Sequence, residues 1–343
     1  MGKKRRDLGF AIFLILGVGL FIYFLFAFGK EAVNLIYQNI SFKYFGIYVA
    51  LHLFTFCPLV WRLQVILKAH KKRIPFFPLL KQTIAGYAVS YITPSVRMGG
   101  EPLRVYMMKK ESGIDVKTGT SCIVLDKFVE FVGSAIYGVV GLGLIMFIPG
   151  VPIQLKLILG VAVFIASASL LFFYYRTILS KGSFSSIVRI FKFDKTKKGK
   201  KFLDSVLVVE ERMAEFFKKD HKAFFISFLF YCMSGVLFVL EFKFLLLSIG
   251  VETGIIELII LITLLGLANI APSPGGIGFL EATQSGLFYA IRNDGSIGFA
   301  LSLIVRIMGL FMVAVGFLLI SQFSGKEIWK KMKSESKELD EIE

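Results

Sequence analysis

Two stretches of the sequence decide the fold: residues 92–103 read ITPSVRMGGEPL, and residues 270–281 read IAPSPGGIGFLE. Each contains I-x-P-S, then a Gly-Gly pair and then a glutamate, and each interrupts a strongly hydrophobic half of the chain. Helix breakers at membrane depth are tolerated only where the freed backbone is buried in protein or lines a cavity. A matched pair of such breaks points to the binding site of an inverted-repeat transporter. We therefore predict an internal duplication; the alternative is a chance repeat of a few letters.

The composition indicates a membrane protein. Of the 343 residues, 56% are hydrophobic, and the mean hydropathy is +0.73. Residues 8–28 carry no charge and are long enough to cross a hydrocarbon core of roughly 30 Å as a helix. A secretory signal would have a shorter apolar region, so we interpret this segment as an uncleaved anchor. Full-length spans are expected at 8–28, 43–67, 120–148, 153–175, 222–247 and 296–320.

The basic residues predict the topology. The formal net charge of +16 is concentrated in clusters that lie in a few short segments. These clusters are not interleaved with aromatic residues, so no nucleic-acid partner is expected. Lys and Arg favour the cytoplasmic side, which is satisfied if 78–110 enters the membrane from inside and returns there, and 257–292 enters from outside and returns. We predict an all-α, polytopic membrane helix bundle with about six full spans, two oppositely oriented re-entrant hairpins and both termini cytoplasmic.

This topology divides the chain into two membrane halves. The first half covers 1–175 and the second covers 222–324, with a cytoplasmic tail at 325–343. Between the halves, 176–221 is a basic cytoplasmic loop. Within it, apolar residues recur at spacings of three and four, which predicts an amphipathic helix. The apolar positions are Phe202, Val206, Val209, Met213 and Phe216.

Ionisable residues inside membrane spans are costly and are functional hypotheses by default. Arg306 stands alone in its span, so it either binds substrate or gates, or forms a structural ion pair. Asp126 and Glu130 share a helix face near Lys127, which favours equally a neutralised structural cluster and a headgroup contact. For the remaining groups we expect structural roles. Arg62 is expected to snorkel, Glu241 and Lys243 to reach the interface, and His52 to be a hydrogen-bonded packing residue.

The two breaks predict anion sites. Gly99, Gly100, Glu101 and Pro102 read as a helix start, since Pro suits a first turn. The second break ends one half-helix and starts the next near Phe279. Helix N-termini at mid-membrane favour anions, and Arg guanidinium groups suit phosphate. Alternatively, Gly and Pro only permit tight packing and Arg97 pairs with Glu101. The candidate residues here are Arg97, Gly99, Gly100, Glu101, Arg104, Pro272, Pro274, Gly275, Gly276 and Gly278.

No cofactor or metal is expected. Cys57, Cys122 and Cys232 lie in apolar runs without metal-ligand spacing, and we interpret them as packing residues. The sequence contains no Walker-type nucleotide motif, so transport would be driven by a gradient or by mass action.

Three segments carry a family resemblance: TPSVRMGGEPLRVYMM (93–108), LDKFVE (125–130) and ANIAPSPGGIGFLEA (268–282). They resemble the lysylphosphatidylglycerol synthase transmembrane-region family, which includes the flippase domain of two-part synthases. The resemblance implies a bundle with two opposed re-entrant hairpins. The family pattern falls on Arg97, Gly99, Gly100, Glu101, Arg104, Asp126, Glu130, Pro272, Pro274, Gly275, Gly276, Gly278, Glu281 and Arg306. In two-part synthases a soluble C-terminal domain transfers lysine; this sequence ends at Glu343, soon after its last expected span, so lysine transfer is not expected.

The leading functional hypothesis is a flippase of the cell membrane for a lipid with a phosphate headgroup. Arg97, Arg104 and Arg306 would bind the phosphate, and Glu101 and Glu281 would bind a cationic headgroup group or exchange protons. The resemblance associates this role with resistance to antimicrobial peptides. A second hypothesis is an intramembrane headgroup transferase, such as the membrane part of a phosphatidylglycerol lysyltransferase, with Asp126, Glu130, Glu101 or Glu281 as acid–base groups. A third is a subunit that presents lipid to a separate enzyme. Membrane lipids are the expected partners, with a homo-oligomer or a separate lipid-modifying enzyme as candidate protein partners.

Overall fold

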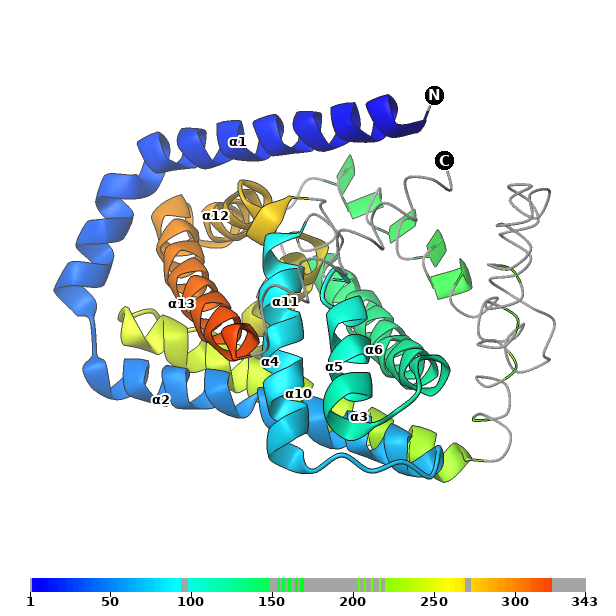
Figure 1. Cartoon of the computed structure of the whole chain (residues 1–343). Helices are drawn as coiled ribbons and strands as arrows, with labels where there is room; N and C mark the ends of the chain where they lie inside the picture. The colour runs from blue at the N-terminus through cyan, green and yellow to red at the C-terminus, as the bar shows by residue number, and fades with distance from the viewer. Residues whose placement is uncertain are drawn as a thin grey trace.

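The computed structural model describes residues 2–93, 98–147, 220–268 and 273–322, together with isolated positions between 153 and 216. Within these residues the chain is helical and has no strand (Figure 1). The elements are α1 (Gly2–Asn39), α2 (Phe42–Phe54), α3 (Phe56–Ala69), α4 (Phe76–Ile92), α5 (Glu101–Ser112), α6 (Val116–Ile145), α10 (His221–Ser248), α11 (Ile255–Ala268), the 3₁₀ turn η2 (Pro274–Gly276), α12 (Phe279–Arg292) and α13 (Gly295–Ser321).

Local sequence explains where these helices start and stop. Helices α2 and α3 form one kinked helix, because Pro58 has no N–H to offer the carbonyl four residues earlier. Helix α5 has Pro102 in its first turn and ends at Gly113, whose φ of +63° is left-handed. Asp115 caps α6 by accepting from the Thr118 N–H at 2.9 Å, and Asp294 caps α13 in the same way from Ser296.

Contacts between the segments that connect the helices define two ends of the bundle. At the Ser41 end, the Ser41 N–H donates to the Ser248 carbonyl at 2.8 Å, which joins the α1–α2 connection to the end of α10. The Arg292 guanidinium also lies at this end, where it reaches the Glu252 carbonyl. At the Ile74 end, Ile74, Ile114 and Phe216 share one buried apolar cluster. The sequence-based topology places the members of each group on one side of the membrane, and the bundle agrees.

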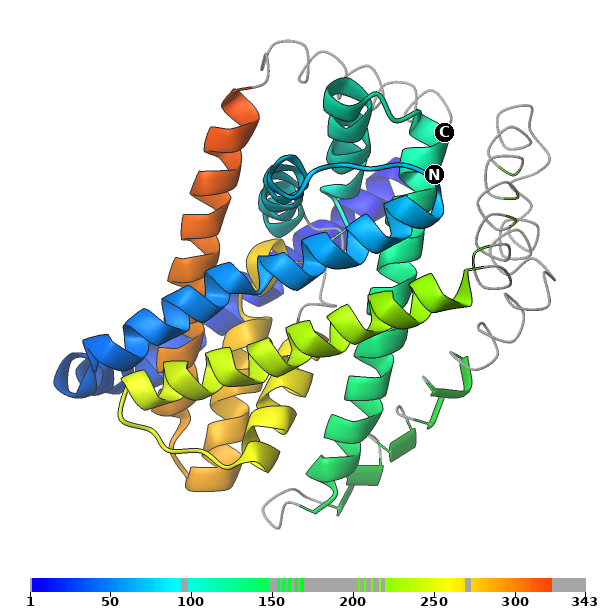
Figure 2. The same cartoon turned by 90° about the horizontal axis from the view of Figure 1, so that it is seen from below.

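The helix pairs α4–α5 and α11–α12 are the two hairpins. The α4–α5 pair begins and ends near the Ile74 end, and the α11–α12 pair begins and ends near the Ser41 end. Figure 2 shows α6 and α13 crossing the bundle in opposite directions, with one hairpin at the starting end of each. Each hairpin packs on the other half: α4 contacts α13, and α11 contacts α6. These reciprocal contacts are the packing that an inverted repeat requires.

Several expectations can be compared with these helices. Five described helices are long and apolar enough to span a membrane: Phe13–Asn39, Phe42–Ala69, Val116–Ile145, His221–Ser248 and Gly295–Ser321. The expected span 153–175 and the expected helix within 200–219 lie largely outside the described residues. The loop expected at 29–42, between the expected spans 8–28 and 43–67, is wrong, because α1 continues to Asn39; a single glycine, Gly29, is too weak a helix breaker to end it.

Candidate functional site

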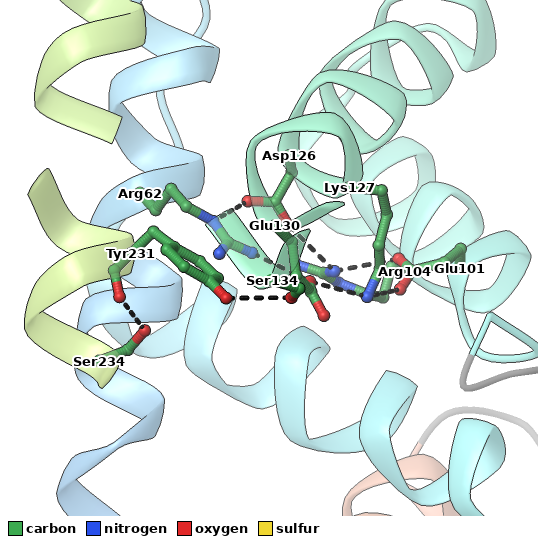
Figure 3. Close-up of polar contacts among 9 residues, drawn as sticks. All are labelled: Arg62, Glu101, Arg104, Asp126, Lys127, Glu130, Ser134, Tyr231 and Ser234. Atoms are coloured by element: carbon green, nitrogen blue, oxygen red, sulfur yellow. Dashed lines mark hydrogen bonds and ion pairs between the residues drawn. The ribbon is translucent and has the colours of Figure 1, made fainter. Parts of the chain in front are cut away.

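Six charged side chains gather where α3, α5 and α6 meet, and we call them the Asp126 cluster (Figure 3). Arg62 Nε on α3 donates to Asp126 Oδ1 on α6 at 2.6 Å. Arg104 Nη1 on α5 lies 3.7 Å from the other oxygen of Asp126. The Asp126 carboxylate therefore bridges two arginines that come from different helices. The members are Arg62, Glu101, Arg104, Asp126, Lys127 and Glu130.

The remaining contacts close this cluster into a network. Glu101 accepts from Arg104 at 3.0 Å and pairs with Lys127 at 3.1 Å. Glu130 pairs with Lys127 at 3.1 Å and with Arg62 at 3.3 Å. Three cations and three carboxylates thus leave no formal net charge, as the neutralised-cluster alternative predicted. Exposure of the side chains rises from 2% at Asp126 to 40% at Glu130, so the network opens on the Glu130 side.

Polar groups of α10 border the cluster. The guanidinium of Arg62 lies over the Tyr231 ring, 6.0 Å from its centroid, and the Tyr231 hydroxyl is 3.0 Å from Ser134 Oγ (Figure 3). Two arginine atoms in the cluster are buried without a hydrogen-bond partner, Arg62 Nη1 and Arg104 Nε. Buried donors without partners are rare, so these two atoms are candidate contacts for an anion.

A separate ion pair occupies the second break. Arg306 on α13 donates through Nε and Nη2 to Glu281 Oε1 at 3.1 and 2.5 Å. Glu281 Oε2 accepts from the Gly278 N–H at 2.8 Å, at the N-terminus of α12. The Glu281 side chain is fully buried and Arg306 is 13% exposed. The carboxylate therefore fixes the arginine at the start of the half-helix.

The two breaks approach each other through Tyr91, near the end of α4. A Cβ added to Gly275 in the second break would lie 2.7 Å from the Tyr91 ring, and one added to Gly309 on α13 would lie 2.8 Å from it. Gly275 has a φ of +57°, so glycine suits this position by conformation as well as by space. Helix α1 also packs here, since the Phe21 ring lies 5.7 Å from the Arg306 guanidinium.

The predicted site residues thus fall into two groups. Glu101, Arg104, Asp126 and Glu130 join the Asp126 cluster, and Gly275, Gly278, Glu281 and Arg306 meet at the second break. Arg97 and Pro272 lie outside the described residues. Gly99 and Pro274 are partly exposed in turns, and Gly276 is buried.

Glycine N–H groups at both breaks are already used by the protein itself. The Gly100 N–H donates to Ser90 Oγ at 2.8 Å, and the Gly276 N–H donates to the Ser273 carbonyl at 3.1 Å. The Gly278 N–H is taken by Glu281. Gly100 also allows the backbones of α4 and α5 to touch, because a Cβ there would lie 1.8 Å from the Gly86 carbonyl oxygen. Positive charge for an anion must therefore come chiefly from the arginines.

Two interpretations of single residues are wrong. Arg62 was expected to snorkel, but it is buried against Asp126, whose carboxylate offers a nearer partner than the interface does. Glu241 was expected at the interface, but it is buried and bound to His52 Nδ1 at 2.8 Å. Lys243 is exposed, and the expectation that His52 is a hydrogen-bonded helix-packing residue is confirmed. A charged residue placed deep in an apolar run, such as Glu241, is the signal that could have indicated this pairing.

Comparison with known proteins identifies the family. A family model described as the lysylphosphatidylglycerol synthase TM region matches residues 8–316. The chain belongs to this family.

Similarity to curated proteins also extends over most of the chain. A UPF0104 membrane protein of Pyrococcus horikoshii is 22% identical over 319 residues, which cover 88% of this chain and 93% of that protein. A UPF0104 membrane protein of Methanothermobacter thermautotrophicus is 22% identical over 273 residues, 75% of this chain and 77% of the relative. No solved structure matches the chain. The family and the five membrane-length helices establish a multi-pass membrane protein with a link to lipid metabolism.

Proposed function

We propose that the chain is a lipid translocator of the cell membrane that moves an anionic or phosphate-bearing lipid between leaflets. Its substrate class is a phospholipid, an aminoacyl-phospholipid or a polyprenyl-phosphate-linked lipid. The headgroup binds near the middle of the bilayer, between α4–α5 and α11–α12, which enter the membrane as re-entrant hairpins from opposite faces. Both termini are cytoplasmic in this proposal.

The observation that carries the proposal is the position of Arg306. It lies eleven residues into the 27-residue helix α13, which is roughly 16 Å from the N-terminal end and roughly 22 Å from the C-terminal end at 1.5 Å per residue. An arginine at this depth is costly unless it faces a partner or a wet cavity. Arg306 remains 13% exposed beside its Glu281 partner, so the guanidinium is paired and still reachable.

A phosphate can replace the carboxylate on this arginine, and charge stays balanced when the displaced Glu281 takes up a proton or a cation of the headgroup. Nε and Nη2 both donate to one oxygen, Glu281 Oε1, and Nη1 lies 3.5 Å from the Gly275 carbonyl. A guanidinium offers five N–H donors in a planar fork that matches phosphate oxygens. The displaced Glu281 keeps its bond to the Gly278 N–H and is free to accept a cation from the headgroup or a proton.

The Asp126 cluster provides a second binding site for the headgroup, nearer the Ile74 end. It opens at Glu130, and Arg62 Nη1 and Arg104 Nε are unpartnered donors within it. A headgroup that moves from Arg306 to this cluster would exchange one set of arginines for another. Every carboxylate of the cluster is held by a cation, which favours ion exchange over acid–base chemistry on the headgroup.

A vesicle assay tests the proposal. Purified protein is reconstituted in phosphatidylcholine vesicles that contain fluorescent phosphatidylglycerol, and a membrane-impermeant quencher reports the leaflet of each label. We expect labelled phosphatidylglycerol to reach both leaflets with its mass unchanged, and Arg306→Gln to abolish this. Lys243→Gln, which removes an exposed cation from α10, is the matched control and should retain activity. Absence of movement for every anionic lipid, or chemical modification of the headgroup, contradicts the proposal.

A further inference from the structure

A third set of ionisable side chains is buried in the bundle, away from both breaks. His52 Nδ1 on α2 lies 2.8 Å from Glu241 Oε1 on α10, and the two side chains are 16% and 3% exposed. The rings of Tyr48 and Phe56 flank the imidazole at 6.1 and 6.2 Å between centroids. The lipid-binding proposal makes no use of this pair, although a buried carboxylate in a membrane span is expensive to keep.

The pair lies at membrane depth. Helices α2 and α10 run antiparallel from the Ser41 end, where the Ser41 N–H meets the Ser248 carbonyl at 2.8 Å. At 1.5 Å per residue, His52 lies roughly 15 Å and Glu241 roughly 10 Å from that end. The pair therefore stands between the Ser41 end and the middle of the bundle, on a different level from the Asp126 cluster.

The hydrogen bond requires that the pair shares at least one hydrogen. A distance of 2.8 Å between a ring nitrogen and a carboxyl oxygen requires a hydrogen between them, and either group can supply it. A neutral imidazole beside a carboxylate carries a net charge of −1. One further proton makes the pair neutral, either as imidazolium with carboxylate or as imidazole with carboxylic acid. The pair thus has two protonation states that differ by one charge.

Two atoms of the pair are able to accept the second proton. His52 Nε2 and Glu241 Oε2 are both buried and have no hydrogen-bond partner. Each carries a lone pair when deprotonated, so each is an acceptor with no competing donor. A buried net charge costs more than a pair whose charges cancel. The pair therefore favours the proton-loaded state while it is sealed and releases the proton when water reaches it.

Neighbouring charges do not neutralise the pair. Within the described residues, the ion-paired side chains of α3, α6 and α11 are bound elsewhere: Arg62, Asp126, Lys127 and Glu130 in the Asp126 cluster, and Glu257 by Arg292. On α10 itself, Lys243 is exposed. The phenol of Tyr48 on α2 faces the pair, and Tyr87 on α4 packs against Phe56 beside it; both phenols are neutral in their ordinary state.

The helices that carry this pair also reach the Asp126 cluster. Helix α3 continues the kinked helix from His52 to Arg62, which binds Asp126. Helix α10 carries Tyr231, which contacts Ser134 of α6, on the same helix as Glu241. The kink lies between His52 and Arg62, and the Thr55 hydroxyl donates to the His52 carbonyl at 2.6 Å beside it. These contacts provide a continuous connection between the pair and the Asp126 cluster.

We propose that His52 and Glu241 form a proton-binding site that couples lipid movement to the proton gradient. The inference rests on the proposed translocator function and names its driving ion. A proton from water on one side binds the open lone pair at Nε2 or Oε2, the neutral pair allows the bundle to change state, and the proton leaves to water on the other side. No bond to the lipid forms or breaks in this cycle.

The test uses the same vesicles with an imposed pH difference and the membrane voltage clamped to zero by potassium and valinomycin. If one proton accompanies each lipid, a difference of one pH unit shifts the leaflet ratio of labelled phosphatidylglycerol by about tenfold. His52→Gln and Glu241→Gln should still let the label equilibrate between leaflets but should abolish this shift. Exchange of the two residues, His52→Glu with Glu241→His, should restore part of it. Lys243→Gln is again the matched control.

The possible outcomes separate the two proposals. Wild-type protein that moves no lipid overturns the translocator function itself. Wild-type protein that moves lipid without a shift under the pH difference, or variants that keep the shift, overturn the proton site and leave the function standing. If the variants do not fold, infrared spectra of the wild-type protein decide: a band of either a carboxylic acid or an imidazolium is expected to appear on acidification, and the absence of both between pH 5 and pH 9 overturns the site.

Discussion

Arg306 and Glu281 hold each other inside the bundle, and the same carboxylate caps the helix that follows the second break. Glu281 Oε1 accepts from Nε and Nη2 of Arg306, while Oε2 accepts from the Gly278 N–H. The first break has a matching contact, since Glu101 at the start of α5 pairs with Lys127 on the next helix at 3.1 Å. In each half, the glutamate that follows the break is thus joined to a cation about one third to one half of the way along the next span.

Removal of Arg306 should affect both stability and transport. Arg306→Ala leaves the fully buried Glu281 without its cation, which costs about 3–5 kcal/mol when a buried pair is broken. The melting temperature in detergent should fall, and lipid movement should drop by roughly 10- to 100-fold, as expected for loss of charge-assisted hydrogen bonds. Arg306→Lys keeps the charge but loses the fork, so it should retain part of the stability and little of the transport.

Replacement of both partners separates the two effects. Arg306→Leu with Glu281→Leu removes both charges from an apolar environment, and such exchanges are often neutral for stability. The double variant should melt near the wild-type temperature and still move no lipid. Transport at the wild-type rate by this variant would show that the pair is only structural.

Substitutions in the buried part of the Asp126 cluster should destabilise the protein strongly, and substitutions on its exposed side should destabilise it little. Asp126→Asn removes the charge that holds Arg62 at 2.6 Å, and both side chains are 2% exposed, so we expect a loss of about 3–5 kcal/mol. Glu130→Gln neutralises a side chain that is 40% exposed, and the loss of stability should stay below about 1 kcal/mol. Unfolding of each variant, and of Arg62→Leu with Asp126→Leu as the double replacement, measures this gradient. Equal losses for Asp126→Asn and Glu130→Gln would contradict the burial seen here.

The sequence predicted the hairpins because Pro and Gly act locally. Helix α12 begins at Phe279, as expected, since the glycines before it adopt φ values of +57° to +80° that other residues avoid. The lysine distribution predicts the orientation of the hairpins, because charge is costly to move across a bilayer. The same local reasoning failed at 29–42, where the single glycine Gly29 does not end α1, which continues to Asn39.

Pairing between distant side chains could not be predicted from the sequence. Arg62 and Asp126 are 64 positions apart, and His52 and Glu241 are 189 apart. A lone charge in a span indicates only that a partner or a wet cavity exists, and the packing of α3 on α6 and of α2 on α10 chooses the partner. Glu101 was expected in the first break and Asp126 in the following span, but their meeting with Arg62 in one cluster depends on tertiary packing.

Glycine at the first break should be required for packing. Gly100→Ala places a methyl group 1.8 Å from the Gly86 carbonyl oxygen, so the backbones of α4 and α5 must separate, at a cost of about 1–3 kcal/mol. Gly286→Ala on α12 is the matched control, because nothing lies within 4 Å of its added Cβ. The control should be neutral or stabilising by up to about 1 kcal/mol from helix propensity. Thermal melting that ranks the two variants in the opposite order would contradict the close approach of α4 and α5.

Labelling of single cysteines tests the direction of the two hairpins. After replacement of the three native cysteines, we expect Ile256→Cys and Asn293→Cys, at the two ends of α11–α12, to react with a membrane-impermeant maleimide in intact cells. Phe77→Cys and Lys109→Cys, at the two ends of α4–α5, should react only after the membrane is opened. All four positions are exposed, so a lack of reaction reports the membrane side and not burial. If either hairpin crossed the membrane once, its two ends would label from opposite faces, and the basic residues at 109–117 would lie on the side that the positive-inside rule disfavours.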